Sequence, residues 1–131
     1  MNRSDPINRN RLQEYSGGEI EFEIELLNLF IEDAQQHLDT IDVAISSAIK
    51  PTEGAAEGDY SEGLAGSNLE TIYQEAHHLK GASGTIGAER FEAISTQLEQ
   101  AARQGQPCIQ HLCALKIAFA ELTIQVSQWP N

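Results

Sequence analysis

Basic residues are scarce in this chain of 131 residues, which has 8 lysines and arginines against 20 aspartates and glutamates and a net charge of −12. Binding to nucleic acid or to an anionic membrane depends on clustered Lys and Arg, so this balance argues against both partners. No apolar run reaches the roughly 20 residues that cross a bilayer. Residues 1–6 also lack the apolar core of a signal peptide. We therefore expect a cytoplasmic protein.

Cysteines and nucleotide-binding motifs are equally few. The two cysteines, Cys108 and Cys113, lie five residues apart on one predicted helix. That spacing fits neither a disulfide within the helix nor a lone zinc site, so we expect reduced thiols. The sequence has no phosphate-binding Gly-Lys-Ser/Thr loop, which argues against a kinase or phosphatase that acts on its own.

Apolar residues instead recur in steps of three and four along four segments, a spacing that predicts amphipathic helices. Residues 19–25 alternate apolar and acidic, as a strand would, but the helical spacing that follows overrules a strand. The four predicted buried seams are Leu27, Phe30, Ala34, Leu38, Ile41, Ile45 and Ala48; Leu69, Ile72, Ala76, Leu79, Ser83 and Ile86; Phe91, Ile94, Leu98 and Ala101; and Cys108, Leu112, Leu115, Phe119, Leu122, Val126 and Trp129.

Capping residues suggest where the first helices begin and end. Asp5 and Pro6 predict an N-cap and first position of a short helix that runs to about Glu14. Ser16, with Glu19 three residues later, predicts a capping box for the next helix. Pro51 would end that helix.

Glycine and proline set the remaining boundaries. Residues 51–67 hold four glycines and no periodic apolar set, so we expect a flexible loop there. Ser67 or Asn68 would cap the next helix, which we expect to end near Ser83 because Gly84 and Gly87 follow. Gly105 would stop the fourth helix and Pro107 would open the fifth.

The expected fold is all-α: an antiparallel up-down four-helix bundle with a short additional N-terminal helix. We expect residues 1–131 to form a single domain, with the short helix within residues 1–15 and the loop at residues 51–67. A chain of this length can bury roughly two-thirds of its unfolded surface in one core.

The segment 76–87, AHHLKGASGTIG, contains the most informative side chains. With about 100° of rotation per residue, His77 and Gly84 lie on the shoulder of the predicted seam, flanked by Lys80 and Gly81. His78 would point away from the core, into solvent. A half-buried histidine satisfied by a neighbour is the alternative for His77, but Lys80 and two helical glycines on one strip favour a site.

These residue types fit a phosphoryl carrier. A neutral imidazole has a nucleophilic lone pair near pH 7, and a nearby ammonium offsets arriving negative charge. Glycine inside a helix is unfavourable by about 0.5–1 kcal/mol relative to alanine, which suggests that something approaches the backbone closely. Residues 71–131 also hold only 5 acids against 4 bases, whereas residues 1–70 hold 15 against 4. The half of the chain with this segment is therefore nearly neutral, which suits a surface that accepts a phosphoryl group, although a long acidic helix that solvates the other half would give the same balance.

The motif Ala76-His77-x-Leu79-Lys80-Gly81, then Gly84, Ile86-Gly87-Ala88 and Leu98-Glu99, resembles histidine-containing phosphotransfer domains of two-component phosphorelays. The resemblance extends to residues 30–34 and covers most of the chain from about residue 12. It implies a histidine phosphotransfer intermediate that relays a phosphoryl group between receiver-domain aspartates and is not itself an enzyme.

The resemblance also implies roles for individual residues. His77 would be the phosphorylated residue and Lys80 the cation facing the phosphate. Gly81 and Gly84 would provide clearance for a response-regulator receiver domain. Glu99 and Arg103 would lie beside the site on the facing helix, although the family often has glutamine where Glu99 stands.

The implied partners are response-regulator receiver domains and a hybrid sensor histidine kinase, with the protein itself a monomer. No cofactor of its own is expected, because the receiver domain would supply Mg²⁺. A metal site in this chain is not expected either. Glu75-x-x-His78 has the spacing of di-iron bundles, but both side chains would project away from the seam, and only Asp33-x-x-x-His37 comes near it.

Two other functions remain open, and a third is disfavoured. A stand-alone phosphotransfer domain of the chemotaxis-kinase type would be phosphorylated by a separate kinase. A helical adaptor without phosphochemistry would use its glycines only for close packing. The dimerisation helix of a sensor kinase is disfavoured, because His78 follows His77 where that class has an acidic residue, and no room remains for a kinase domain.

Overall fold

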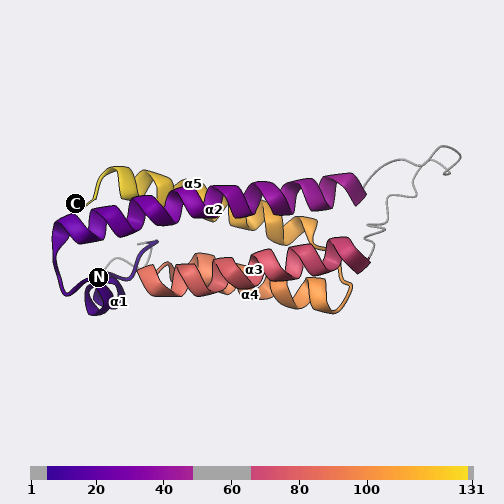
Figure 1. The fold of residues 1–131 in the computed structure, drawn as a ribbon, viewed down its shortest axis with the longest axis horizontal. Coiled ribbons are helices and arrows are strands. Elements are labelled where there is room, and N and C mark those ends of the chain that lie inside the picture. Colours follow the sequence, from indigo (N-terminus) through magenta and orange to yellow (C-terminus); the bar gives the residue numbers. More distant parts are fainter. Residues whose placement is uncertain (1–5, 49–65, 130–131) are drawn as a thin grey trace, which may run out of the picture.

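The computed structural model describes residues 6–48 and 66–129, which form five helices and, within these ranges, no strand. The helices are α1 (Arg9–Ser16), α2 (Ile20–Ala48), α3 (Gly66–Ile86), α4 (Glu89–Arg103) and α5 (Ile109–Ser127). The four longer helices lie along the long axis of the molecule, and α1 lies at one end (Figure 1). The predicted helical bundle with a short helix in front is confirmed.

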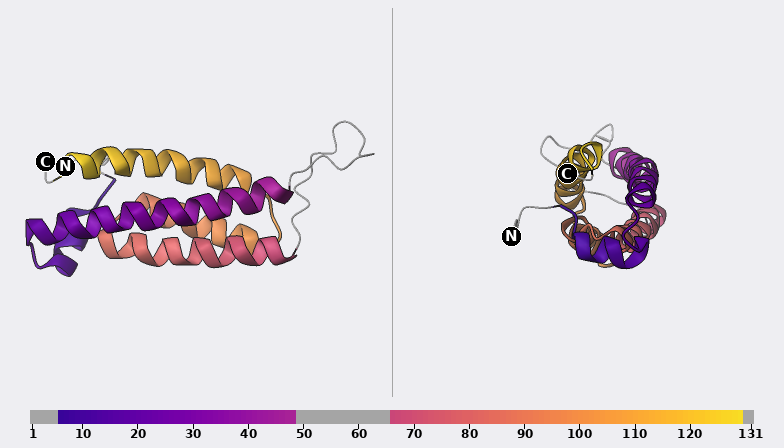
Figure 2. Two further views of the ribbon diagram at one scale, coloured as in Figure 1. Left: turned by 45° about the horizontal axis from the view of Figure 1, so that its top comes forward. Right: turned by 90° about the vertical axis from the view of Figure 1, so that its left-hand side faces the viewer.

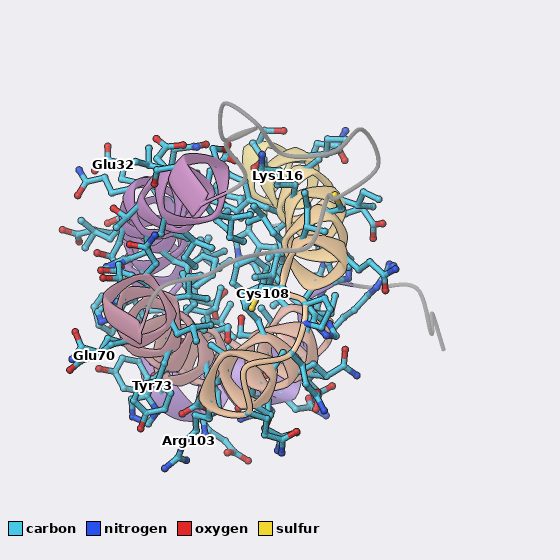
Figure 3. The ribbon with its side chains drawn as sticks, turned by 90° about the vertical axis from the view of Figure 1, so that its right-hand side faces the viewer. Glu32, Glu70, Tyr73, Arg103, Cys108 and Lys116 are labelled. Atoms are coloured by element: carbon cyan, nitrogen blue, oxygen red, sulfur yellow. The ribbon has the colours of Figure 1, made fainter. Side chains whose placement is uncertain are left out.

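The four long helices surround one core. α3 packs most extensively on α4 and α2, and α5 packs on both α4 and α2, so the ring of helices closes. The end-on views show this ring (Figures 2 and 3), with Cys108 inside it and Glu32, Glu70 and Lys116 at its outer surface. α1 contacts α2 and α3.

The predicted seams form the core. Nearly all of their residues are buried, and only Leu69 and Phe119 are half-buried among those whose side chains are described. Phe30 and Phe91 meet edge to face, with ring centroids 5.6 Å apart. Each fully buried Leu, Ile or Phe side chain contributes about 1.5–3 kcal/mol relative to exposure. Residues 20–25 are helical despite their alternating pattern, as the helical spacing of the seam that follows them predicts.

The first helix begins later than the sequence predicts. Pro6 and Ile7 precede it, and Asn8 is the N-cap, since its Oδ1 accepts from the backbone N–H groups of Asn10 at 3.1 Å and Arg11 at 3.3 Å. An Asn side chain satisfies two N–H groups that the first turn leaves unpaired. The proposed cap at Asp5 is therefore wrong for α1.

The predicted capping box is also wrong, because Ser16 is the last residue of α1. Its hydroxyl donates to Glu23 Oε2 at 2.9 Å and accepts from Gly18 N–H at 3.1 Å. The other oxygen of this buried carboxylate accepts from Trp129 Nε1 at 3.2 Å. Glu23 thus joins the end of α1 to α2 and to the residues after α5.

The third helix is longer than predicted at both ends. It begins at Gly66, so neither Ser67 nor Asn68 is its N-cap. The rest of the predicted loop, residues 51–65, lies outside the described residues, and so does the predicted helix end at Pro51. It continues through Gly84 to Ile86, because Gly87 rather than Gly84 takes the left-handed conformation, with φ of 77°. The helix then ends as Ala88 N–H donates to Ser83 O at 2.9 Å.

The last connection follows the prediction in part. Gly105 has φ of 67°, and Gln106 N–H donates to Ala101 O at 2.8 Å, so glycine stops α4 as expected. Pro107 does not open α5, however, because Cys108 is the N-cap and Ile109 the first helical residue. Cys108 is buried, Cys113 is exposed, and no disulfide joins them.

Candidate functional site

His77 projects from the middle of α3 toward α4. Its side chain is 62% exposed, and its Nδ1 lies 2.9 Å from Glu99 Oε2 on α4. One ring nitrogen is therefore held by the protein while most of the ring faces solvent. This is the shoulder position that the helical spacing predicts.

Glu99 is the buried side of this pair, with only 6% of its side chain exposed. Its second oxygen, Oε1, lies 3.3 Å from Lys80 Nζ, so one carboxylate contacts both predicted site residues of α3. Burial raises the pKa of the Glu99 carboxyl, but the hydrogen bonds from His77 and Lys80 outweigh it, and the net pKa lies below the ordinary value. Glu99 is consequently ionised near pH 7.

The ionised carboxylate fixes the tautomer of the histidine. A carboxylate only accepts hydrogen bonds, so the neutral ring of His77 donates from Nδ1–H to Glu99. The lone pair then lies on Nε2, the nitrogen that no described contact occupies. The arrangement presents a nucleophilic nitrogen of defined direction.

Tyr73, one turn before His77, was not singled out from the sequence. Its ring stacks near that of His77, with centroids 6.2 Å apart and planes 27° apart. The guanidinium of Arg103 lies over the ring of Tyr73, 4.9 Å from the ring centroid, and Figure 3 shows both residues at the outer surface of the bundle. Arg103 is therefore linked to His77 through the ring of Tyr73. The sequence signal that could have identified Tyr73 is its i, i+4 spacing from His77 on one helix.

The two helical glycines differ in their surroundings. A Cβ at Gly81 would meet nothing within 4 Å, so the backbone there is open. A Cβ at Gly84 would lie 2.7 Å from Glu92 Oε2 and 3.5 Å from Arg11 Nη2. Glu92 and Arg11 form an ion pair of 3.1 Å across this position, so Gly84 admits an intramolecular contact.

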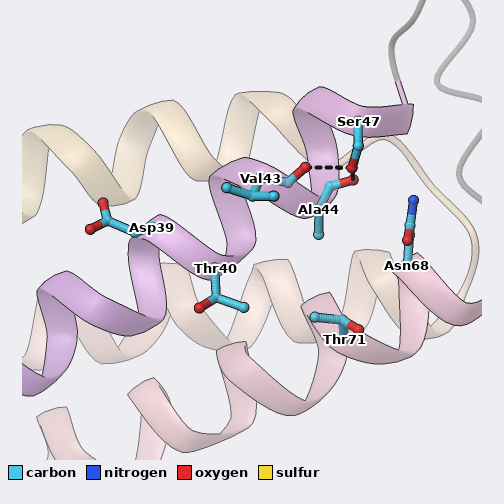
Figure 4. Close-up of a pocket in the computed structure, with 7 residues that line it drawn as sticks. All are labelled: Asp39, Thr40, Val43, Ala44, Ser47, Asn68 and Thr71. Carbon is cyan, nitrogen blue, oxygen red and sulfur yellow. Dashed lines mark hydrogen bonds between the residues drawn. The ribbon is translucent and has the colours of Figure 1, made fainter.

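One hollow of the bundle lies away from His77. This hollow, of about 410 Å³ between α2 and the start of α3, is lined by Thr40, Val43, Ser47 and Thr71, among others (Figure 4). Ser47 Oγ donates there to the backbone oxygen of Val43 at 2.6 Å. The lining has no pair of acid and base side chains, so the hollow offers no catalytic constellation.

The sequence predicts that His78 points into solvent, but in the structure its half-exposed ring also contacts α2. Its Nε2 lies 2.7 Å from Asp33 Oδ2 on α2, and its ring centroid lies 4.0 Å from that of His37. Glu75 contacts His37 from the other side. The packing of α2 against α3 brings these two pairs together, which the separate sequence patterns did not reveal.

The fold and this site define a helical bundle built around one solvent-facing histidine whose second nitrogen is held by a buried carboxylate. Residues 25–129 match the family model of the Hpt domain, and the chain belongs to that family. The family implies histidine phosphotransfer in two-component signalling, in which these domains are phosphocarriers that interact with receiver domains and kinases.

No curated protein and no solved structure matched the chain. Within residues 6–48 and 66–129, no helix is both long and apolar enough to cross a membrane.

Proposed function

We propose that this protein carries a phosphoryl group on His77 Nε2 and relays it between the aspartates of receiver domains in a multistep two-component phosphorelay. The observation that supports this most directly is the hydrogen bond between His77 Nδ1 and the buried Glu99. It leaves the lone pair on the exposed nitrogen, where a partner's acyl phosphate can approach.

In the proposed transfer, the Nε2 lone pair attacks phosphorus in line. The N–P bond forms as the bond between phosphorus and the aspartyl oxygen breaks, and the partner's carboxylate leaves with that electron pair. The proton on Nδ1 stays on the ring, which becomes positively charged and faces the Glu99 carboxylate. The reverse sequence delivers the group to a second aspartate, so the carrier has no net turnover and is not an enzyme.

Lys80 and the partner would supply the remaining charge. The Lys80 ammonium contacts the same Glu99 carboxylate as His77 and is partly exposed, so it would be available to offset the charge of an arriving phosphoryl group. Mg²⁺ would come from the receiver domain rather than from this chain. Gly81, with open space beside its backbone, would let a receiver domain come close to α3.

The remaining features of the proposal follow from the relay. The bundle would be antiparallel and up-down, which the two-residue connection between α3 and α4 supports. The protein would act as a cytoplasmic monomer that binds receiver domains and a hybrid sensor histidine kinase transiently. Brief association is what a carrier with two successive partners requires.

Label transfer from a phosphorylated receiver domain tests the assignment. Replacing His77 with Gln should abolish labelling, because the amide has no nucleophilic ring nitrogen, while far-UV circular dichroism stays unchanged. His78→Gln is the matched control and should be labelled like the unsubstituted protein. Labelling that survives in His77→Gln, or that is lost only in His78→Gln, would refute the proposal.

A further inference from the structure

A second group of ligand-type side chains lies where α2 packs on α3, whereas Glu99 approaches α3 from α4. Asp33 and His37 are one turn apart on α2, and His78 faces them from α3. One ligand atom from each lies within 4.8 Å of the others. Two imidazole nitrogens and one carboxylate from two helices make up a common donor set for transition metals.

The same carboxylate faces both rings. Asp33 Oδ2 lies 2.7 Å from His78 Nε2, and Asp33 Oδ1 lies 3.2 Å from His37 Nε2. The two rings lie with their centroids 4.0 Å apart, and each presents its Nε2 to an oxygen of the same carboxylate between the helices. The side chains of Asp33 and His78 are partly exposed, which leaves a path for an ion and a position for water.

Glu75 orients one of these rings. Its carboxylate contacts His37 Nδ1, so with a metal ion on Nε2 the ring would donate from Nδ1–H to Glu75. A metal-binding imidazole typically donates its other N–H to a carboxylate in this way, which fixes the tautomer that coordinates.

The charges in the cluster call for a cation. A neutral imidazole has one N–H group, yet both nitrogens of His37 lie against carboxylate oxygens. In the neutral ring one of these two contacts therefore lacks a hydrogen, and a metal ion at Nε2 would fill that place.

We propose that Asp33, His37 and His78 bind one divalent transition-metal ion of the zinc class, with Glu75 as the residue that orients His37. Two imidazoles favour such an ion over Mg²⁺ or Ca²⁺, which take oxygen ligands. The donor atoms of a tetrahedral zinc site lie roughly 3.3 Å apart, so small side-chain rotations bring these atoms to coordinating distance. The bound ion joins α2 to α3 at the turn that contains the phosphoacceptor, without using His77.

A zinc titration tests the site. The protein is the full chain without an affinity tag, in a Cys113→Ser background, because an exposed thiol binds zinc by itself. Zn²⁺ is titrated in competition with a chromophoric chelator, and Co²⁺ is used as a spectroscopic substitute. One equivalent should bind and raise the unfolding temperature.

Variants decide which residues bind the ion. His78→Gln and His37→Gln should each weaken zinc affinity at least tenfold, and Glu75→Gln should weaken it by about 10–100-fold. The matched controls are His111→Gln on α5 and His77→Gln, which should leave the affinity within about twofold of the background. Circular dichroism without metal shows whether each variant is folded.

Three results would overturn the proposal: no zinc binding tighter than in folded His78→Gln, tight binding that persists in His37→Gln and His78→Gln, or binding lost in His77→Gln or His111→Gln. Because none of these measurements involves a phosphoryl group, the metal site and the proposed function stand or fall separately.

Discussion

Removing the Glu99 carboxylate should slow the phosphorylation of His77 measurably. A hydrogen bond to a charged group contributes about 1.5–3 kcal/mol. Here the acceptor is buried but the His77 ring is 62% exposed, so water takes over part of the interaction, and we discount it to about 1 kcal/mol. The ring gains positive charge as the N–P bond forms, so this contact strengthens toward the transition state. If about 1 kcal/mol is lost there, Glu99→Ala should lower the rate about fivefold, since about 1.4 kcal/mol corresponds to a factor of ten.

Glu99→Gln separates orientation from charge. The Gln amide oxygen still accepts from Nδ1–H, so the lone pair stays on Nε2 and the rate should fall less than in Glu99→Ala. Single-turnover transfer from a phosphorylated receiver domain gives the rates, and ¹⁵N NMR of the histidine rings reports the tautomer. A Glu99→Ala rate equal to that of the unsubstituted protein, with an unchanged His77 tautomer, would refute the orienting role.

Three predictions concern stability. The stabilisation from ionised Glu99 is complete above the unfolded pKa, about 4.3, and is lost as the pH falls through the lower folded pKa. In urea unfolding across pH, the free energy of unfolding should therefore fall more steeply toward acid for the unsubstituted protein than for Glu99→Gln. Parallel curves would contradict this. Glu23→Leu leaves buried Trp129 Nε1 without its acceptor and should destabilise the protein by about 1–3 kcal/mol, whereas Glu23→Gln should destabilise it less; fluorescence of the single tryptophan follows unfolding. Gly87→Ala adds a Cβ 2.5 Å from a backbone oxygen at a position with φ of 77°. Gly105→Ala is the comparison, because φ is 67° there but the space is open, so it should reduce stability by only about 1–2 kcal/mol and Gly87→Ala by more. Equal losses of stability in denaturant titrations would show that the contact at Gly87 relaxes.

The two adjacent histidines illustrate how the bundle assigns different surroundings to neighbouring residues. His77 turns toward α4 and meets Glu99, and His78 turns toward α2 and meets Asp33. Successive helical residues differ by about 100° in direction. Because α3 packs on both α2 and α4, its two adjacent histidines meet partners on different helices. A carboxylate holds each ring, but only His77 has a described contact at Nδ1 and an open Nε2.

The sequence was sufficient for the parts of the fold that depend on local periodicity. The seams at Leu27–Ile45 and Phe91–Ala101 are buried as predicted, because a three-and-four spacing places those side chains on one face of any helix. The same spacing placed His77 on the shoulder of α3. Helix ends were predicted less well. The boundaries lie at Asn8, Gly66 and Gly87, and other residues nearby in the sequence are equally suitable as caps.

The sequence by itself thus determined the helices, their buried faces and the partly exposed position of His77, because these depend on spacing within one segment. Only the tertiary structure decided which side chains meet across helices: Glu99 with Lys80, Asp33 with His78, and Glu92 over the backbone of Gly84. Those contacts depend on how far each helix is rotated and shifted against its neighbours. Packing of the whole core sets that rotation and shift, and no single segment encodes it.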